Sequence, residues 1–339
     1  MSVHGGALSP FRLPAPDAAA LVRWPARFGR RFLVFVDVEE EFDWSAPLDR
    51  ANRSVTAIAA LPQAHARFAD HGIAPVYLID HPVVSDAGAV DLLRGVLADP
   101  RVGLGAQLHA WVTPPFAAPQ PGDTYAGNLP PALEAAKLDT LTDRLTDAFG
   151  RAPIAYRAGR YGIGPATAAA LVRRGYRVES SVRARYDYSA DGGPDFSRVG
   201  SAAFRLGDLI EVPLTTSFTG RLRRRGAGLY PALGRLPLAR GAFATAGLLQ
   251  RVALTPEDMP IAEACAAVRV AVEEEGHGLI SLSFHSPSLV PGHTPYVRST
   301  ADLARLWDWW RQMTALLESL AVRPATLAEV IAAADAPDN

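Results

Sequence analysis

The feature that most constrains the fold of this chain is a repeated order of short apolar runs and segments with helical spacing. The first run, 32–36, is rich in Val and Phe and is followed by the acidic cluster 37–41. Runs of this length and composition predict buried β-strands. Further runs of this kind, separated by helical patterns, lie at 74–79, 102–108, 154–156, 176–182, 209–213 and 279–284. About seven strands that alternate with helices predict an α/β fold of parallel βαβ units, closed as a barrel or wound as an open sheet.

Length and composition support one large domain. With 339 residues, 49% apolar and 20% charged, the chain can bury a sizeable core, and α/β barrels of this length occur as single domains. We expect an N-terminal lead-in at 1–31 and a single barrel domain at 32–335. An irregular insertion is expected at about 184–254, because this stretch is first polar and Gly-rich and then basic.

Charge and cysteine content narrow the possible partners. Lys and Arg total 34 against 35 for Asp and Glu, so the net charge of -1 provides no long-range attraction for nucleic acid or an anionic membrane. Cys265 is the single cysteine, which leaves any metal to His and carboxylate ligands. No stretch approaches the ~18 apolar residues of a membrane span, and 1–31 has no signal-peptide core. We therefore expect a cytoplasmic protein with no membrane span and a small or neutral substrate.

Titratable residues recur at the ends of the predicted strands. They are Asp37 and Glu39, Asp80 and His81, His109, Arg157, and His285. One polar residue at a strand end is more often a turn former than a catalyst. The carboxyl ends of parallel strands meet at one end of a barrel, however, so several such residues predict a site there.

The acidic cluster offers paired carboxylates. Asp37 and Glu39 are two residues apart and face the same way if strand geometry persists. One of them could then bind a cation while the other accepts a proton. The alternative is that Glu39 to Glu41 form a solvated acidic loop.

The later strand ends offer imidazole and guanidinium groups. His109 has an imidazole suited to zinc or a similar ion. His285 is placed to act as a general acid, and the alternative is a buried histidine satisfied by the backbone. Arg157 and Arg160 could each hold a carboxylate through paired hydrogen bonds.

Four motifs in order carry a family resemblance. VDVEEEF, GAQLHAWVTPPF, YRAGRYG and SLSFHSPSL are similar to the ordered motifs of the polysaccharide deacetylase family, the NodB-homology domains of carbohydrate esterase family 4. Within this family the chain resembles the intracellular, WalW-like branch in its GNLP, YRAGRYG, GPDFS and HSPSLVPGHTPY segments. The resemblance implies a deformed (β/α)7 barrel and hydrolysis of an acetyl group with a divalent metal, usually zinc.

The resemblance also implies a role for each matched residue. Asp37 matches the catalytic base and Arg157 the arginine that orients it. His285 matches the catalytic acid. Glu39 stands where a variant of the first motif places its metal-binding aspartate, and His109 matches the first histidine of the metal pair.

One departure from the family pattern affects the metal. The second histidine of the pair is expected at position 113, where this chain has Thr113. A threonine hydroxyl is a poor zinc ligand, and catalytic zinc typically has three protein ligands. Asp80 or His81 could supply the third.

Substrate contacts are expected from Trp111, Arg160 and Tyr161. Aromatic residues near the motifs could stack on a sugar face or simply pack. The cluster Arg221 to Arg225 is either a solvated basic face or a site for an acidic sugar or phosphate-bearing substrate.

The function that we expect is metal-dependent deacetylation of a carbohydrate or glycoconjugate. A first alternative is a degenerate or repurposed barrel that binds carbohydrate or a partner without metal-dependent hydrolysis, which the threonine at 113 favours. A second is an amide hydrolase that acts on a non-sugar substrate, since the same chemistry cleaves other C–N bonds.

Overall fold

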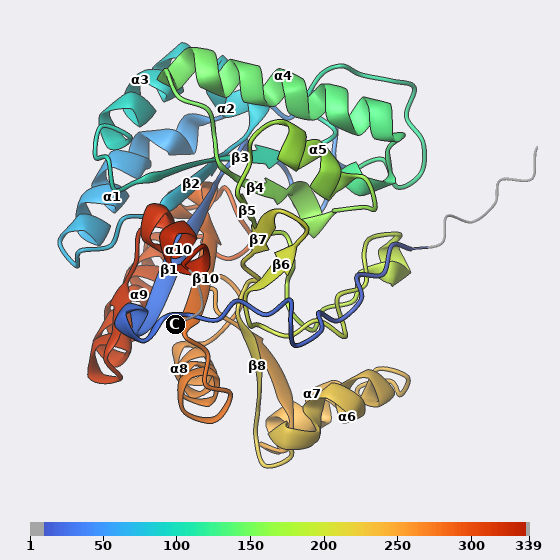
Figure 1. Cartoon of the computed structure of the whole chain (residues 1–339), viewed down its shortest axis with the longest axis vertical. Coiled ribbons are helices and arrows are strands. Elements are labelled where there is room, and N and C mark those ends of the chain that lie inside the picture. Colours follow the sequence, from blue (N-terminus) through green and yellow to red (C-terminus); the bar gives the residue numbers. More distant parts are fainter. Residues whose placement is uncertain (1–9, 337–339) are drawn as a thin grey trace, which may run out of the picture.

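The computed structural model describes residues 10–336, and its central feature is one curled, mostly parallel sheet. The strands of this sheet are β1 (Arg30–Val38), β2 (Val76–Ile79), β3 (Gly103–Leu108), β4 (Ala155–Ala158), β5 (Val178–Glu179), β6 (Phe204–Leu206), β7 (Leu209–Glu211), β10 (Leu279–His285) and β11 (Val322–Pro324). Their order is β10-β1-β2-β3-β4-β5-β7-β6, with β11 paired to β1. Neighbours from β10 to β7 are parallel, and β6 runs antiparallel to β7. The predicted deformed (β/α)7 barrel is confirmed, because the seven strands from β10 to β7 curl around one interior (Figure 1).

Side chains rather than a main-chain ladder connect β7 to β10. Beyond β7 the chain passes through Pro213, which has no N–H to donate. The backbone N–H of Thr215 donates to Ser281 Oγ over 3.0 Å, and the N–H of Ser281 donates to Thr215 Oγ1 over 2.9 Å. The barrel is therefore deformed at this junction.

Helices cover the outer face of the sheet (Figure 1). They are α1 (Leu61–Ala69), α2 (His81–Ser85), α3 (Ala87–Val96), α4 (Pro131–Phe149), α5 (Thr167–Arg173), α8 (Ile261–Arg269) and α9 (Thr300–Ser319). The last helix, α10 (Leu327–Ala334), packs instead against the inner side of the sheet through Leu327 and Val330. Their starts follow local signals. Pro131 opens α4 where its missing N–H has no intrahelical partner, and capping boxes begin α9 at Ser299 and Asp302 and α10 at Thr326 and Glu329.

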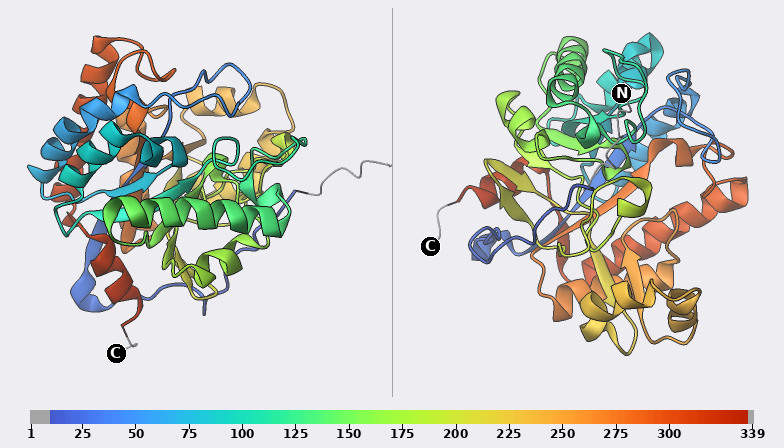
Figure 2. Two further views of the ribbon diagram at one scale, coloured as in Figure 1. Left: turned by 90° about the horizontal axis from the view of Figure 1, so that it is seen from above. Right: turned by 90° about the vertical axis from the view of Figure 1, so that its right-hand side faces the viewer.

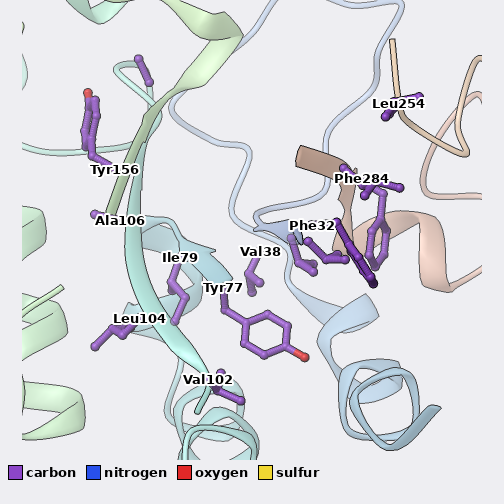
Figure 3. Close-up of a cluster of buried hydrophobic side chains, with 14 of the residues drawn as sticks. Phe32, Val38, Tyr77, Ile79, Val102, Leu104, Ala106, Tyr156, Leu254 and Phe284 are labelled. Atoms are coloured by element: carbon purple, nitrogen blue, oxygen red, sulfur yellow. The ribbon is translucent and has the colours of Figure 1, made fainter. Parts of the chain in front are cut away.

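The pleat of each strand divides the core into two layers. Phe32 and Val38 of β1 point outward into the large cluster between sheet and helices (Figure 3). Leu33 and Phe35 point inward into a smaller cluster that fills the barrel. A fully buried side chain of this size stabilises the fold by about 1.5–3 kcal/mol. Because side chains alternate, the next inward residue after Phe35 is Asp37.

Two segments extend beyond the barrel. Residues 10–29 run beside β6, where Leu21 pairs with Phe204, and residues 1–9 of the predicted lead-in lie outside the described residues. The second segment is a separate hairpin of β8 (Thr216–Thr219) and β9 (Gln250–Ala253), with α6 (Gly226–Leu233) and α7 (Ala239–Thr245) between its strands. Figure 2 shows these helices at the edge of the molecule, away from the layers of the barrel. Strand β7 lies within the stretch 184–254 and belongs to the barrel sheet.

Several predicted boundaries differ from the observed ones. The predicted strand 176–182 shortens to β5, because Ser181 Oγ, in place of a main-chain carbonyl, accepts the N–H of Ala158. Arg157 lies inside β4 and Asp37 inside β1, rather than after these strands. Among the described residues, no helix is long and apolar enough to cross a membrane.

Candidate active site

A pocket of about 570 Å³ opens at the C-terminal ends of the parallel strands. The predicted site residues that line it are Asp37, Glu39, His109, Trp111, Arg157, Arg160, Tyr161 and His285. They come from β1, β3, β4 and β10 or from the segments that directly follow these strands. Parallel strands thus bring together residues that are far apart in the sequence.

The inward face of β1 carries both predicted carboxylates. Asp37 and Glu39 follow Leu33 and Phe35 on this face and are 2% and 3% exposed. Glu40 points the other way and is fully buried. The alternative of a solvated acidic loop is therefore wrong for Glu39 and Glu40.

Asp37 is held by a buried arginine. Arg157 Nη1 donates to Asp37 Oδ1 over 2.7 Å and to Ser283 Oγ over 2.5 Å. Its Nε and Nη2 donate to the carbonyl and hydroxyl of Ser180. With its guanidinium 5.1 Å above the Phe35 ring, Arg157 is fully engaged and can orient Asp37.

His285 faces Asp37 from the neighbouring strand. The parallel register pairs Asp37 with His285, and His285 Nε2 lies 3.7 Å from Asp37 Oδ2. The other ring nitrogen, Nδ1, lies 2.7 Å from Glu257 Oε2. Burial opposes a charged imidazole, but Glu257, Glu39 and Asp37 outweigh it and raise the pKa of His285 to about 10. His285 is thus protonated at neutral pH. We call Asp37, Arg157, His285 and Glu257 the acid–base side.

The opposite wall is built where β1 and β3 end, and we call Glu39, Glu40, Gln107 and His109 the metal side. His109 Nε2 lies 3.4 Å from Glu39 Oε2, and its Nδ1 lies 2.7 Å from Glu40 Oε2. Gln107 Nε2 donates to Glu39 Oε2 over 2.9 Å. Burial raises the pKa of Glu39 to about 8. Glu40 also accepts from the indole of Trp111 over 2.8 Å, so it orients both rings.

The residues of the metal side fit a divalent cation. Glu39 Oε1 and Gln107 Oε1 are buried and have no hydrogen-bond partner. Two ligands at about 2.1 Å on a tetrahedral zinc lie roughly 3.4 Å apart, which is the observed separation of His109 Nε2 and Glu39 Oε2. A carboxylate on the far ring nitrogen is the usual support of a metal-binding histidine, and Glu40 holds that position. The donor set is oxygen and nitrogen, which suits zinc or a similar ion.

A second possible metal site lies behind His109. Glu40, Asp80 and His109 offer three ligand atoms that all lie within 4.8 Å of one another. Asp80 caps α2 by accepting the N–H of Val83 and also accepts the N–H of Glu40. Burial and the adjacent Glu40 raise the pKa of Asp80 well above its ordinary range. These carboxylates already have protein donors, and Asp80 is fully buried and does not line the pocket.

His81 and Thr113 lie apart from the pocket. His81 is the first residue of α2, its Nδ1 lies 3.4 Å from Ser85 Oγ, and burial lowers the pKa of its imidazole to about 4. The Thr113 hydroxyl is fully buried and has no hydrogen-bond partner, while its carbonyl accepts from Lys137. Neither residue lines the pocket.

The predicted substrate residues form the rim. Trp111 stacks on the His109 ring with centroids 4.2 Å apart. Arg160 and Tyr161 both adopt left-handed backbone conformations, with φ of 56° and 60°. Such strain is uncommon outside glycine and clusters at functional sites. Arg160 stacks on Tyr125, with its guanidinium carbon 4.0 Å from the ring centroid.

Several residues of the site, in the pocket wall or directly behind it, were missed by the sequence analysis. Gln107 precedes His109 by two positions, so the period of a strand was an available signal. Glu40 was visible only as a neighbour of Glu39. Glu257 follows β9 and has no sequence signal that links it to His285. Two aromatic residues, Trp44 and Tyr296, also line the pocket, with their ring centroids 5.4 Å apart.

Comparisons with known proteins concern the fold. No protein-family model matches the chain, and neither does any curated protein sequence. Among solved structures, a GH57 branching enzyme from Thermococcus kodakaraensis matches with a TM-score of 0.51 at 12% identity, over 92% of this chain and 72% of that one. This likeness shows a shared fold and says nothing about activity.

Solved structures described as deacetylases match less closely. A protein of Mycobacterium smegmatis described as a polysaccharide deacetylase has a TM-score of 0.48 at 15% identity, over 96% of this chain and 99% of that one. The chitin deacetylase of Colletotrichum lindemuthianum has a TM-score of 0.42 at 13% identity, with 96% of both chains covered.

Proposed function

We propose that this protein is a metal-dependent deacetylase that hydrolyses an acetamide or acetyl ester on a carbohydrate or glycoconjugate. The observation that carries the proposal is that a pair of acid–base residues and a pair of metal-binding residues face each other across one pocket. Asp37 and the protonated His285 lie on one side, and the oxygen and nitrogen atoms of Glu39 and His109 lie on the other. The resemblance of the four motifs to the polysaccharide deacetylase family, and to its WalW-like branch, supports the same reaction.

The acid–base side supplies the proton transfers. Asp37, held by Arg157, accepts a proton from the attacking water. His285 donates its Nε2 proton to the leaving amine or alcohol, while Glu257 stabilises the imidazolium from Nδ1. Water adds to the acetyl carbon, the C–N or C–O bond breaks, and the products are acetate and the free amine or alcohol.

The metal side would hold the cation through Glu39 and His109. A bound zinc ion supplies Lewis-acid polarisation of the acetyl carbonyl and lowers the pKa of water. Glu40 keeps the proton on His109 Nδ1 and so directs Nε2 into the pocket. Gln107, whose Oε1 has no partner, is a candidate for the further ligand that Thr113 does not provide.

The walls of the pocket support a sugar substrate. Trp44, Trp111 and Tyr296 present aromatic surface beside polar groups, a combination that suits the apolar face and the hydroxyls of a sugar ring. A more open hollow of about 780 Å³ shares Phe42 and Trp44 with the pocket and includes His293. A substrate of more than one sugar unit would extend into it.

The test is acetate release from a panel of N-acetylated and O-acetylated sugars by the purified protein, with and without added zinc. The proposal predicts release that requires the metal, and about one bound metal ion by elemental analysis. His109→Ala should lose both. An exposed histidine outside the pocket, His71, provides the control variant His71→Ala, which should lose neither.

The degenerate barrel remains the second candidate, favoured by Thr113 in place of a histidine. It predicts that calorimetric titration detects sugar binding while no acetate is released at any metal loading. Sugar binding without turnover in the metal-loaded protein would therefore select this candidate over the deacetylase.

A further inference from the structure

The hairpin between β8 and β9 carries a one-sided charge. Residues 212–256 contain no Asp or Glu. In the same stretch there are seven arginines, at positions 221, 223, 224, 225, 235, 240 and 251. Because the whole chain has a net charge of -1, the rest of the molecule is net negative. An anionic surface would therefore be attracted to this hairpin and repelled elsewhere.

The segment 220–249, which we call the α6–α7 unit, has a small core of its own. Phe218, Leu233 and Leu249 form a cluster separate from both barrel cores. Figure 1 shows α6 and α7 at the end of the hairpin, outside the layers of the barrel. The unit is thus a projection that is held to the rest of the molecule mainly through β8 and β9.

The turn between α6 and α7 exposes two leucines. Leu236 is 62% exposed and Leu238 is 89% exposed, whereas the other exposed large apolar residues of the described chain reach at most 39%. Leu238 also has a φ of 60°, a left-handed conformation that is uncommon for residues other than glycine. The backbone of Leu238 caps α7, but neither leucine side chain belongs to the core of the unit, so their exposed apolar surface is buried by nothing within it.

Most of the surrounding arginines are free of carboxylates. Arg223 and Arg224 contact Glu274, at 2.8 Å and 3.9 Å. Glu273 and Glu275 lie beside them in the same crevice. The other four exposed arginines of the unit are Arg221, Arg225, Arg235 and Arg240. Within the described part of the chain they make no ion pair. Two of these four flank the exposed leucines directly in the sequence RLPLAR.

We propose that the α6–α7 unit docks the protein onto the surface of an anionic phospholipid bilayer. Leu236 and Leu238 enter the boundary between headgroups and acyl chains, and the arginines pair with lipid phosphates. Exposed apolar side chains combined with basic residues and no acidic ones are what peripheral membrane binding requires. A nucleic acid would use the arginines but leave the leucines without a role, and binding to vesicles that contain no protein distinguishes the bilayer from an acidic protein partner. The proposal does not depend on the proposed deacetylase activity.

The test is co-flotation of the full chain with vesicles of phosphatidylcholine alone or mixed with phosphatidylglycerol. We expect binding to the mixed vesicles that weakens as salt is raised, and little binding to phosphatidylcholine alone. Leu236→Ser with Leu238→Ser should reduce the partition coefficient about tenfold or more. Arg221→Gln with Arg235→Gln should reduce it by a similar factor.

Matched control variants show whether the loss of binding is specific to the α6–α7 unit or follows from removing any exposed leucine or arginine. Leu92→Ser replaces an exposed leucine of α3, and Arg27→Gln with Arg323→Gln removes the same charge elsewhere on the surface. Both controls should bind like the parent chain, and melting temperatures check that all variants fold. Absence of binding to mixed vesicles, or equal loss in the controls, would overturn the proposal. Binding that needs the arginines but not the leucines would also overturn it, in favour of another polyanion.

Discussion

The two sides of the pocket differ in how completely their polar groups are satisfied. On the acid–base side, Arg157 makes four hydrogen bonds and His285 is held between two carboxylates. On the metal side, Glu39 and Gln107 each keep a buried oxygen without a partner. Leaving a buried polar atom unpaired costs about 1–3 kcal/mol. The acid–base side is therefore complete in the protein alone, whereas the metal side is arranged for a further group.

The largest effect is expected from the acid–base side. Asp37→Asn keeps a hydrogen-bond acceptor for Arg157 but removes the base, so kcat should fall by about 10²–10⁴-fold. Metal content should not change, because the variant leaves Glu39 and His109 intact. Acetate release and elemental analysis measure the two quantities.

An exposed carboxylate supplies the control for this variant. Asp91→Asn on α3 removes the same charge outside the pocket and should leave kcat unchanged. If Asp37→Asn keeps full turnover, Asp37 is not the catalytic base. The acid–base side would then not supply the proton transfers that distinguish it from the metal side.

The adjacent residues Glu39 and Glu40 distinguish the two possible metal positions. If the ion lies in the pocket, Glu39→Gln removes a direct ligand and should abolish stoichiometric zinc. Glu40→Gln then removes only the support of His109 Nδ1 and should weaken zinc binding by about 10–100-fold. Competition with a chromogenic chelator measures both affinities. The opposite order would place the ion in the buried group of Glu40, Asp80 and His109.

A smaller effect is expected away from both sides of the pocket, at the buried Glu134 of α4, which accepts from the hydroxyl of Thr167. Burial raises the pKa of this carboxyl to about 7, above its ordinary value of 4.5. The folded state favours the protonated form of this carboxyl. The resulting stability of the fold is fully present below pH ~4.5 and is lost as the pH rises through about 7. Glu134→Gln should flatten this dependence and raise the free energy of unfolding at pH ~8 by ~2 kcal/mol.

Urea unfolding at several pH values measures this change. The exposed Glu318→Gln of α9 is the matched control and should leave the pH dependence as it is. A parent chain whose stability does not fall over this pH range would contradict the assignment to Glu134.

The smallest effect concerns Glu257, the partner of His285. Glu257→Gln removes the carboxylate that most strongly favours the imidazolium, so the raised pKa of His285 should fall. Activity that needs a protonated His285 is lost as the pH rises through that pKa. The alkaline limb of the kcat profile should therefore move to lower pH by about one unit. An unchanged limb would mean that another group sets it.

The sequence predicted the elements with strong local patterns. The helix 131–149 coincides with α4, and the run 102–108 contains β3, because their apolar periods are regular and their ends carry clear signals. The grouping of Asp37, His109, Arg157 and His285 at one end was also predictable, since parallel strands bring their carboxyl ends together.

Other features had no local signal. The shortening of the predicted strand 176–182 to β5 depends on Ser181 replacing a main-chain acceptor. Helices α6 and α7 fall in a stretch without regular apolar spacing, and they are held by a cluster that includes Phe218 and Leu249 from the two ends of the hairpin.

The sequence by itself determined the α/β class, the order of the strands along the chain and the residue types available for chemistry. Only the tertiary structure decided that Glu39 and Glu40 face opposite sides of His109, that Glu257 reaches His285 and that Asp80 lies behind the pocket. The physical reason is that strand periodicity sets the direction of a side chain relative to its own strand. Its partners, by contrast, depend on the register and curl of strands brought together from distant parts of the chain.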